Sequence, residues 1–223
     1  MDILVNEQIY FPTPGKFNDP FDTQCSFKKD FENASFEKAH KIFGDDAENM
    51  TVYKHSDKLS SRVSEFKEEL KHFGILSLCA TRHNQLLWAH YANNHTGICI
   101  GFKRTPTNIL GNDAHTTEVN YIKNHPTISA SSIKGSKAKK LAQHRVLHSK
   151  SELWQYEEEW RCVVSEGDKT YTIPGEISEI IFGCRTSESD KSQIRQIIRY
   201  KPINLYQAEL KTNQFGLKIA KLK

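Results

Sequence analysis

The stretch LWQYEEEWRCVV, from Leu153 to Val164, decides the architecture around it. Three glutamates lie between aromatic residues, and an arginine and several β-forming residues follow them. We expect a helix to end near Trp154 and a strand to begin near Glu157. The two-residue repeat of a strand then places Glu157, Glu159 and Arg161 on one face of a sheet.

Two interpretations of that face are open. Two neighbouring carboxylates raise the pKa of at least one of them, and an adjacent arginine lowers it again, so the face can hold an ionised carboxylate against a developing positive charge. Alternatively, Glu157 and Arg161 form an ion pair on an exposed sheet face while Trp160 fills the core. Taken alone, the stretch favours the second interpretation.

Periodicity predicts further elements on both sides of this stretch. Apolar residues at steps of three and four predict a helix from an N-cap at Ser56 to a stop at Gly74. A helical rhythm also runs from Leu141 to Leu153. Strands are predicted at ILSLCAT, GICIGF, TTEVNYI, ISEIIFG, INLYQAEL and FGLKIAKL, and helices at QLLWAHYA and ESDKSQIRQIIRY. Because strands outnumber helices without strict alternation, we expect an α+β fold with a mixed, mainly antiparallel central sheet flanked by helices, in a single domain over 1–223.

Composition bounds the possible partners and the compartment. The chain has 223 residues, 37% of them apolar, and a net charge of +4, which permits nucleic acid as a partner without requiring it. No apolar run has the roughly 20 residues of a membrane span, and the N-terminus lacks a signal-peptide layout, so we expect a cytoplasmic protein without a membrane partner. Free thiols in a reducing compartment best explain the five cysteines, Cys25, Cys79, Cys99, Cys162 and Cys184.

Two other stretches carry candidate site residues. In FNDPFD, Asn18 and Asp19 can bond to their own backbone ahead of Pro20, which predicts a rigid corner. In LLWAHYANNHTGICIGF, helical spacing predicts an aromatic wall with an imidazole, formed by Trp88, Tyr91 and His95. A core aromatic stripe explains the same pattern equally well.

The remaining motifs do not favour a metal site or a phosphate site. His90 and His95 are five residues apart and have no third ligand nearby, so no metal is expected. The basic run from Lys134 to Lys140 is more typical of a solvated face than of a phosphate-binding patch.

The motifs in their order resemble a known bacterial family. NEQIYFPTPGKFNDPFD, LCAT, LLWAHYANNHTGICIGF, KSELWQYEEEWR and ISEIIFG together cover nearly the whole chain and resemble domain of unknown function 2971. Similar sequences usually begin with a further strand of the type Leu-Tyr-Lys-Tyr-Arg ahead of the position of Met1. We therefore expect this chain to lack that strand.

The family's layout is remotely similar to the ADP-ribosyltransferase fold, in which a late glutamate orients the ribose of NAD and stabilises an oxocarbenium-like transition state. This resemblance implies an NAD-dependent transferase, with NAD as substrate, that loses a nucleotide-binding residue with the missing strand. The implied roles are catalysis by Glu159, or alternatively Glu157; stacking on nicotinamide or adenine by Tyr91 or Trp88; phosphate binding by Arg161, Lys150 or His90; and shaping of the pocket by Asn18 and Asp19.

Two alternative classes stay open. One is a nucleotide- or nucleic-acid-binding module that uses the run from Lys134 to Lys140 and the aromatics Trp88, Tyr91 and Trp154. The other is a non-enzymatic interaction protein, an effector or regulator in a defence setting, in which NDPFD and EEEWR serve as corner and ion-pair devices. For that class, Glu159→Gln should reduce stability and leave no activity to lose.

Overall fold

The computed structural model describes residues 2–28 and 52–222 of the chain. Its α-helices are α1 (Asp2–Val5), α3 (Val52–His72), α4 (Gln85–Tyr91), α5 (Ser136–Leu147) and α6 (Glu188–Ile198). Short 3₁₀ turns are η1 (Pro14–Lys16), η3 (Ile109–Gly111), η4 (Ala130–Ile133) and η5 (Glu152–Glu157).

The strands are short and spread along the whole described chain. They are β1 (Gln8–Phe11), β2 (Ser26–Phe27), β3 (Gly74–Cys79), β4 (Ile98–Phe102), β5 (Thr116–Glu118), β6 (Asn120–Ile122), β7 (Thr127–Ile128), β8 (Ser149–Ser151), β9 (Glu159–Val164), β10 (Lys169–Thr172), β11 (Ile177–Phe182), β12 (Asn204–Leu210) and β13 (Leu217–Lys221).

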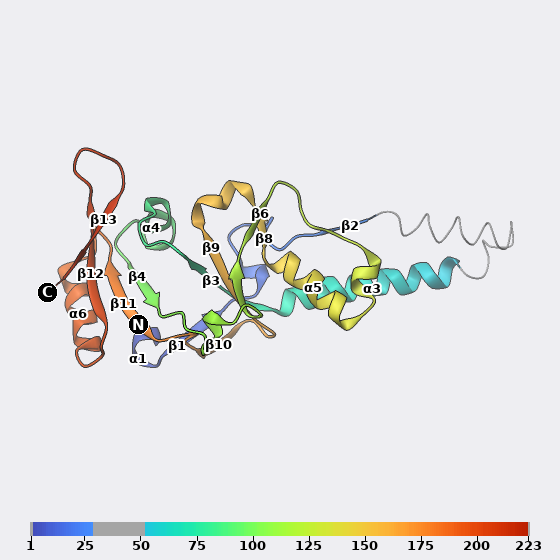
Figure 1. The fold of residues 1–223 in the computed structure, drawn as a ribbon, viewed down its shortest axis with the longest axis horizontal. Helices are drawn as coiled ribbons and strands as arrows, with labels where there is room; N and C mark the ends of the chain where they lie inside the picture. Colours follow the sequence, from blue (N-terminus) through green and yellow to red (C-terminus); the bar gives the residue numbers. More distant parts are fainter. Residues whose placement is uncertain (1, 29–51, 223) are drawn as a thin grey trace.

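Strand pairing is mainly antiparallel. A sheet of order β13-β12-β11-β4 forms one end of the molecule, and the long helix α3 extends toward the other end (Figure 1). Between them, β9 lies between β3 and β5, antiparallel to both. β1 pairs with β10, whereas the pairs β2–β7, β6–β8 and β11–β12 are parallel. The α+β class with mixed, mainly antiparallel strands is confirmed, and the strands are distributed over several small sheets.

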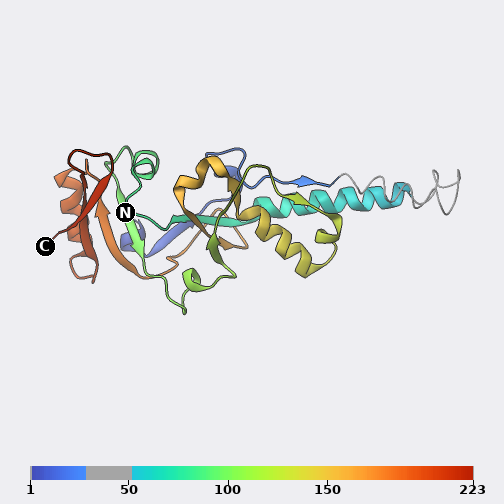
Figure 2. The same cartoon turned by 45° about the horizontal axis from the view of Figure 1, so that its top comes forward.

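The apolar core consists of three clusters of buried residues. One cluster packs α3 and α5 against β3 and includes Phe66, Ile75 and Val146. A second packs α6 against β11, and a third packs α4 against the same sheet. Both views place β9 and η5 between the two ends of the molecule (Figures 1 and 2). The elements that carry EEEWR therefore lie between the cluster around α3 and α5 and the clusters at the sheet end.

The predicted long helix leading into EEEWR is wrong in its extent. Helix α5 ends at Leu147, β8 follows, and η5 then leads to β9, which begins at Glu159. The apolar rhythm was misleading because Leu153 is exposed to solvent. Ser149–Ser151 instead pairs in parallel with β6.

Two other predicted boundaries also differ from the structure. Helix α3 begins at Val52, so Ser56 lies inside the helix and does not cap it. No glycine or proline separates these two residues, and the backbone can therefore remain helical. The predicted strand TTEVNYI is divided at the buried Val119, because β5 pairs with β9 while β6 pairs with β8.

Among the described residues, no helix has both the length and the apolar character needed to cross a membrane. The five cysteines are free thiols, although only Cys162 is fully buried and Cys79 is exposed.

Candidate functional site

The centre of the candidate site is one face of β9. Glu159 and Arg161 lie on this face, as strand alternation predicts, and both side chains are buried, Arg161 completely with 0% exposure. Trp160 lies on the opposite face, where the Arg104 guanidinium stacks 4.4 Å from its ring. The expected exposed ion pair between Glu157 and Arg161 is wrong, because this face is covered and Arg161 pairs with other residues.

Glu157 reaches the same site from outside the strand. It is the last residue of η5, and Glu158 then turns the chain with a left-handed backbone (φ 47°) before β9 begins. This turn points the Glu157 carboxylate toward Glu159. Strand alternation does not place it there, because Glu157 lies outside β9. Glu157 as a whole residue is 4% exposed.

Lys150 joins the two glutamates. Its ammonium lies 2.5 Å from Glu157 Oε2 and 2.8 Å from Glu159 Oε2. Lys150 is the middle residue of β8 and is itself buried, and its ammonium also lies 5.2 Å from the centre of the Trp154 ring. A cation held in this way screens the repulsion between two carboxylates that burial would otherwise make unfavourable.

Arg161 completes the buried cluster. Its Nη2 donates to Asp22 Oδ2 at 2.6 Å, its Nη1 donates to the Leu147 carbonyl at 2.6 Å, and its Nε donates to Glu159 Oε1 at 2.8 Å. Three carboxylates, of Asp22, Glu157 and Glu159, thus face two cations, and the formal charge of the cluster is one negative.

The two glutamates differ in how many of their hydrogen-bond acceptor positions are occupied. Glu159 Oε1 accepts from Ser77 and Arg161, and its Oε2 accepts from Lys150 and Arg161. A carboxylate offers about four acceptor positions, so those of Glu159 are filled. Glu157 accepts from Lys150 on one oxygen and from the Tyr91 hydroxyl, at 2.7 Å, on the other. Of the two glutamates, Glu157 is therefore the one with acceptor positions left for a ligand in the described structure.

The NDPFD corner closes a ring of contacts around Glu157. Asp19 accepts from the Phe21 backbone at 2.9 Å, as expected for a locally bonded corner, and its other oxygen accepts from Trp154 Nε1 at 2.7 Å. The Asn18 side chain hydrogen-bonds the Tyr91 hydroxyl. The corner, helix α4 and turn η5 thus meet at one place, as a shared site requires.

The cluster sets the protonation of its members. Burial disfavours the charged form of Glu159, but Arg161 and Lys150 outweigh it and hold the pKa of this carboxyl below its usual value. Burial acts against Lys150 as well, yet the two glutamates raise its pKa. Burial and the neighbouring Glu157 raise the pKa of Tyr91, and burial raises that of Asp22 despite Arg161. Lys150 is therefore a stable cation, and Tyr91 remains a hydrogen-bond donor at neutral pH.

The predicted aromatic wall is wrong. Helix α4 ends at Tyr91, and Asn93, Asn94 and His95 all have positive φ, so His95 does not continue the helical face. Trp88 is buried in the apolar core under the sheet, where its Nε1 donates to the Arg82 carbonyl. Of the four predicted residues in this segment, only Tyr91 contacts the cluster.

His90 and the basic run also lie apart from the cluster's hydrogen bonds. His90 is exposed and packs edge-on against Tyr91, with ring centres 6.2 Å apart. Lys139 pairs with Glu69 of α3 at 2.5 Å, whereas Lys134 and Lys137 are exposed.

Sequence reasoning missed three members of the site, Asp22, Ser77 and Tyr121. Asp22 is the last residue of the FNDPFD motif, so the motif itself held the signal for it. Ser77 belongs to β3 and lies opposite Arg161 in the strand pairing, and its hydroxyl donates to Glu159 Oε1 at 2.7 Å. The Tyr121 hydroxyl accepts from the Glu159 backbone N–H at 2.8 Å. No local pattern points to either of them.

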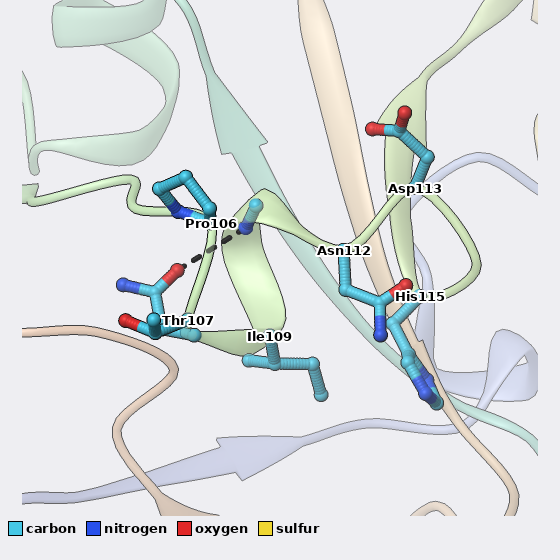
Figure 3. Close-up of a pocket in the computed structure, with 8 residues that line it drawn as sticks. Pro106, Thr107, Ile109, Asn112, Asp113 and His115 are labelled. Atoms are coloured by element: carbon cyan, nitrogen blue, oxygen red, sulfur yellow. Dashed lines mark hydrogen bonds between the residues drawn. The ribbon is translucent and has the colours of Figure 1, made fainter.

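A cavity of about 490 Å³ lies elsewhere, along the loop from Pro106 to His115. Figure 3 shows that its Asp113 and His115 side chains point in different directions, and the dashed bond joins Asn108 to the Gly111 backbone at 3.1 Å. These groups do not converge on a common point, so the cavity offers no constellation comparable to the buried cluster.

No curated protein and no solved structure matches the chain. The family described as protein of unknown function (DUF2971) matches residues 87–162. This range contains Tyr91, Lys150, Glu157, Glu159 and Arg161, and it ends within β9. The resemblance predicted from the motifs is confirmed: over the segment that supplies most of the charged cluster, the chain resembles the DUF2971 family.

Proposed function

We propose that the protein is an enzyme that transfers or hydrolyses a glycosyl group of NAD, in the manner of an ADP-ribosyltransferase, with Glu157 as the catalytic carboxylate. One observation carries this proposal: Glu157 is buried and held by Lys150 and Tyr91, and it still has acceptor positions for a substrate. Glu159, the first choice from sequence, serves in this proposal to hold Lys150 and Arg161.

The chemistry needs a fixed negative charge. When the bond between the ribose C1′ and the nicotinamide nitrogen breaks, the bonding electrons leave with nicotinamide and positive charge develops at C1′. A carboxylate already oriented in a site of low dielectric stabilises that charge without reorganising. The net negative charge of the cluster acts in the same direction.

The side chains around Glu157 suit the rest of such a substrate. Tyr91 is 57% exposed although its hydroxyl reaches Glu157, and Trp154 is partly exposed beside Lys150. Their rings provide faces on which nicotinamide or adenine can stack. A ribose hydroxyl can take the place of the Tyr91 hydroxyl on Glu157, because both are donors of the same kind.

The test compares three variants with the wild type. Binding of NAD, with AMP and a short RNA as controls, is measured by calorimetry, and released nicotinamide is assayed in parallel. Glu157→Gln should lower nicotinamide release by about 10²-fold or more, the usual effect of losing one transition-state contact. Its melting temperature should fall less than that of Glu159→Gln, because Lys150 keeps its bond to Glu159. Glu158→Gln is the matched control, since Glu158 is the exposed neighbour, and should retain full activity.

Glu159→Gln separates the two glutamates further. It breaks the bonds to Lys150 and Arg161 and should lower both stability and activity. Full activity in Glu157→Gln, or no binding and no cleavage of NAD by the wild type, would refute the proposal.

A second candidate function is binding of single-stranded nucleic acid. The observation that favours it is three exposed lysines, Lys134 just before α5 and Lys137 and Lys140 in its first half. If these three each neutralise one phosphate, log K for RNA should fall with log salt at a slope of about −2. An RNA affinity that is independent of salt would exclude this use of the run.

A further inference from the structure

A second surface of the molecule has the properties of a docking site. A groove of about 420 Å³ lies between α4 and the turn that joins β12 to β13. Leu86 and Ala89 of α4 line one wall, and Leu210, Phe215 and Leu217 of the hairpin line the other. In Figures 1 and 2 the hairpin turn stands beside α4 at the sheet end of the molecule.

The walls of this groove expose large apolar side chains. Phe215 is 96% exposed and Leu210 is 73% exposed, and Leu86 opposite them is also exposed. Leu217, in contrast, is buried and anchors the hairpin to Trp88 in the core beneath the groove. The floor is thus rigid, and the rim presents apolar surface to water, which is typical of a binding site.

An unpaired strand edge adjoins the groove. β13 is the outermost strand of the order β13-β12-β11-β4, and no other strand of the described chain pairs with its outer side. Its register with β12 begins at the pair Leu210–Leu217, which lies in the groove itself. An extended segment can therefore seat a side chain in the groove and continue along β13 by backbone hydrogen bonds.

The charge of this surface is positive. Lys211 lines the groove, and Lys218 and Lys221 lie on β13. Glu209 on β12 offsets part of this charge, since it lies 3.7 Å from Lys218, with both side chains largely exposed. Three lysines against one glutamate leave two positive charges along the hairpin and β13, with Lys211 at the groove itself.

We propose that this groove and the outer edge of β13 bind an extended acidic peptide segment of a partner protein, with one large apolar side chain seated between Leu86 and Phe215. The lysines attract an acidic segment and disfavour a basic one. They also disfavour a second copy of this chain, because pairing two β13 edges would bring Lys218 and Lys221 of both copies together.

This proposal goes beyond the NAD chemistry and does not depend on it. Tyr91 lies at the end of α4 and reaches Glu157, whereas Gln85, Leu86 and Ala89 line the groove. The two surfaces share a helix and use different residues of it. Peptide binding is measured without NAD, so the failure of one proposal leaves the other untouched.

The experiment selects peptides on the intact protein. A displayed library of random peptides of about ten residues, the length of a long strand, is selected on the wild type, and the enriched peptide is synthesised with a fluorescent label. We expect Asp and Glu flanking a Leu or Phe in the enriched sequence. Its affinity, measured by fluorescence anisotropy, should fall as salt is raised.

Matched variants decide the location. Phe215→Ser and Lys211→Glu should each weaken the labelled peptide about tenfold or more, which is about 1.4 kcal/mol. Leu153→Ser changes another highly exposed apolar residue, on η5, and should leave the affinity unchanged. All three residues are exposed, so melting temperatures should stay close to that of the wild type.

Three results would overturn the proposal. One is an enriched sequence that is neutral or basic, and another is an affinity that survives Phe215→Ser. The third is a dimer of the wild type, measured by light scattering, that becomes monomeric in Phe215→Ser. That result would identify a second copy of the chain as the occupant of the groove.

Discussion

At the scale of single residues, the stability of the charged cluster depends on Arg161. Its guanidinium is fully buried and pairs with carboxylates from two distant parts of the chain, Asp22 and Glu159. Burying an ion pair costs desolvation energy, which good geometry and further hydrogen bonds offset. Removing one partner leaves that cost uncompensated.

Arg161→Met should therefore lower the free energy of unfolding by about 3–5 kcal/mol, as expected when one partner of a buried pair is lost. Urea unfolding measures this change. Lys103→Met is the control, because the Lys103–Glu176 pair has both side chains 56% exposed and should contribute less than about 1 kcal/mol. Equal costs for the two variants would show that burial does not set the strength of the Arg161 pairs.

At the scale of elements, the sheet end of the molecule depends on a close backbone approach at the end of β11. The Gly183 N–H donates to the Gly97 carbonyl, and the Arg185 N–H donates to the His95 carbonyl, both at 3.0 Å. A Cβ on Gly183 would lie 2.1 Å from the His95 oxygen. The turn after α4 thus docks on β11 only because residue 183 has no side chain.

Gly183→Ala should accordingly destabilise the fold by about 1–3 kcal/mol, the usual cost of overpacking, and thermal unfolding measures it. Gly15→Ala is the comparison, because a Cβ there meets no atom within 4 Å. If both variants have the same melting temperature, the turn can move away from β11 without loss of stability.

At the scale of the whole molecule, stability should depend on pH through His148. This residue caps α5, its ring stacks 4.0 Å from that of His144, and burial together with His144 and Arg161 lowers its pKa to about 4. An unfolded histidine has a pKa near 6.5, so the unfolded chain binds the proton more readily between these values. Stability should therefore fall as the pH is lowered from about 6.5 to about 4.

The loss from this one residue should approach about 3 kcal/mol at the acid end. The free energy of unfolding is measured at several pH values for the wild type and for His148→Gln. The variant should show a shallower decline over this range. Glu159, whose pKa is lowered in the fold, adds a decline of its own only as the pH falls below about 4.3, the usual pKa of an unfolded glutamate. Parallel curves would mean that His148 does not titrate as its surroundings indicate.

The sequence by itself determined the α+β class, the helices α4 and α6, and the strands β3, β4, β11, β12 and β13, because their periodicity is local. It also determined that Glu159 and Arg161 share a face, since a strand imposes that alternation. The family resemblance followed from the order of the motifs.

Only the tertiary structure decided how the charges are partnered. Asp22 lies 139 residues from Arg161 in the chain, and Lys150 is buried between two glutamates because β8 pairs with β6. The left-handed turn at Glu158 brings Glu157 to the cluster from outside the strand. Local patterns describe which side a residue faces along its own element, whereas the choice of a buried charge's partner depends on which elements pack together, and no short segment contains that information.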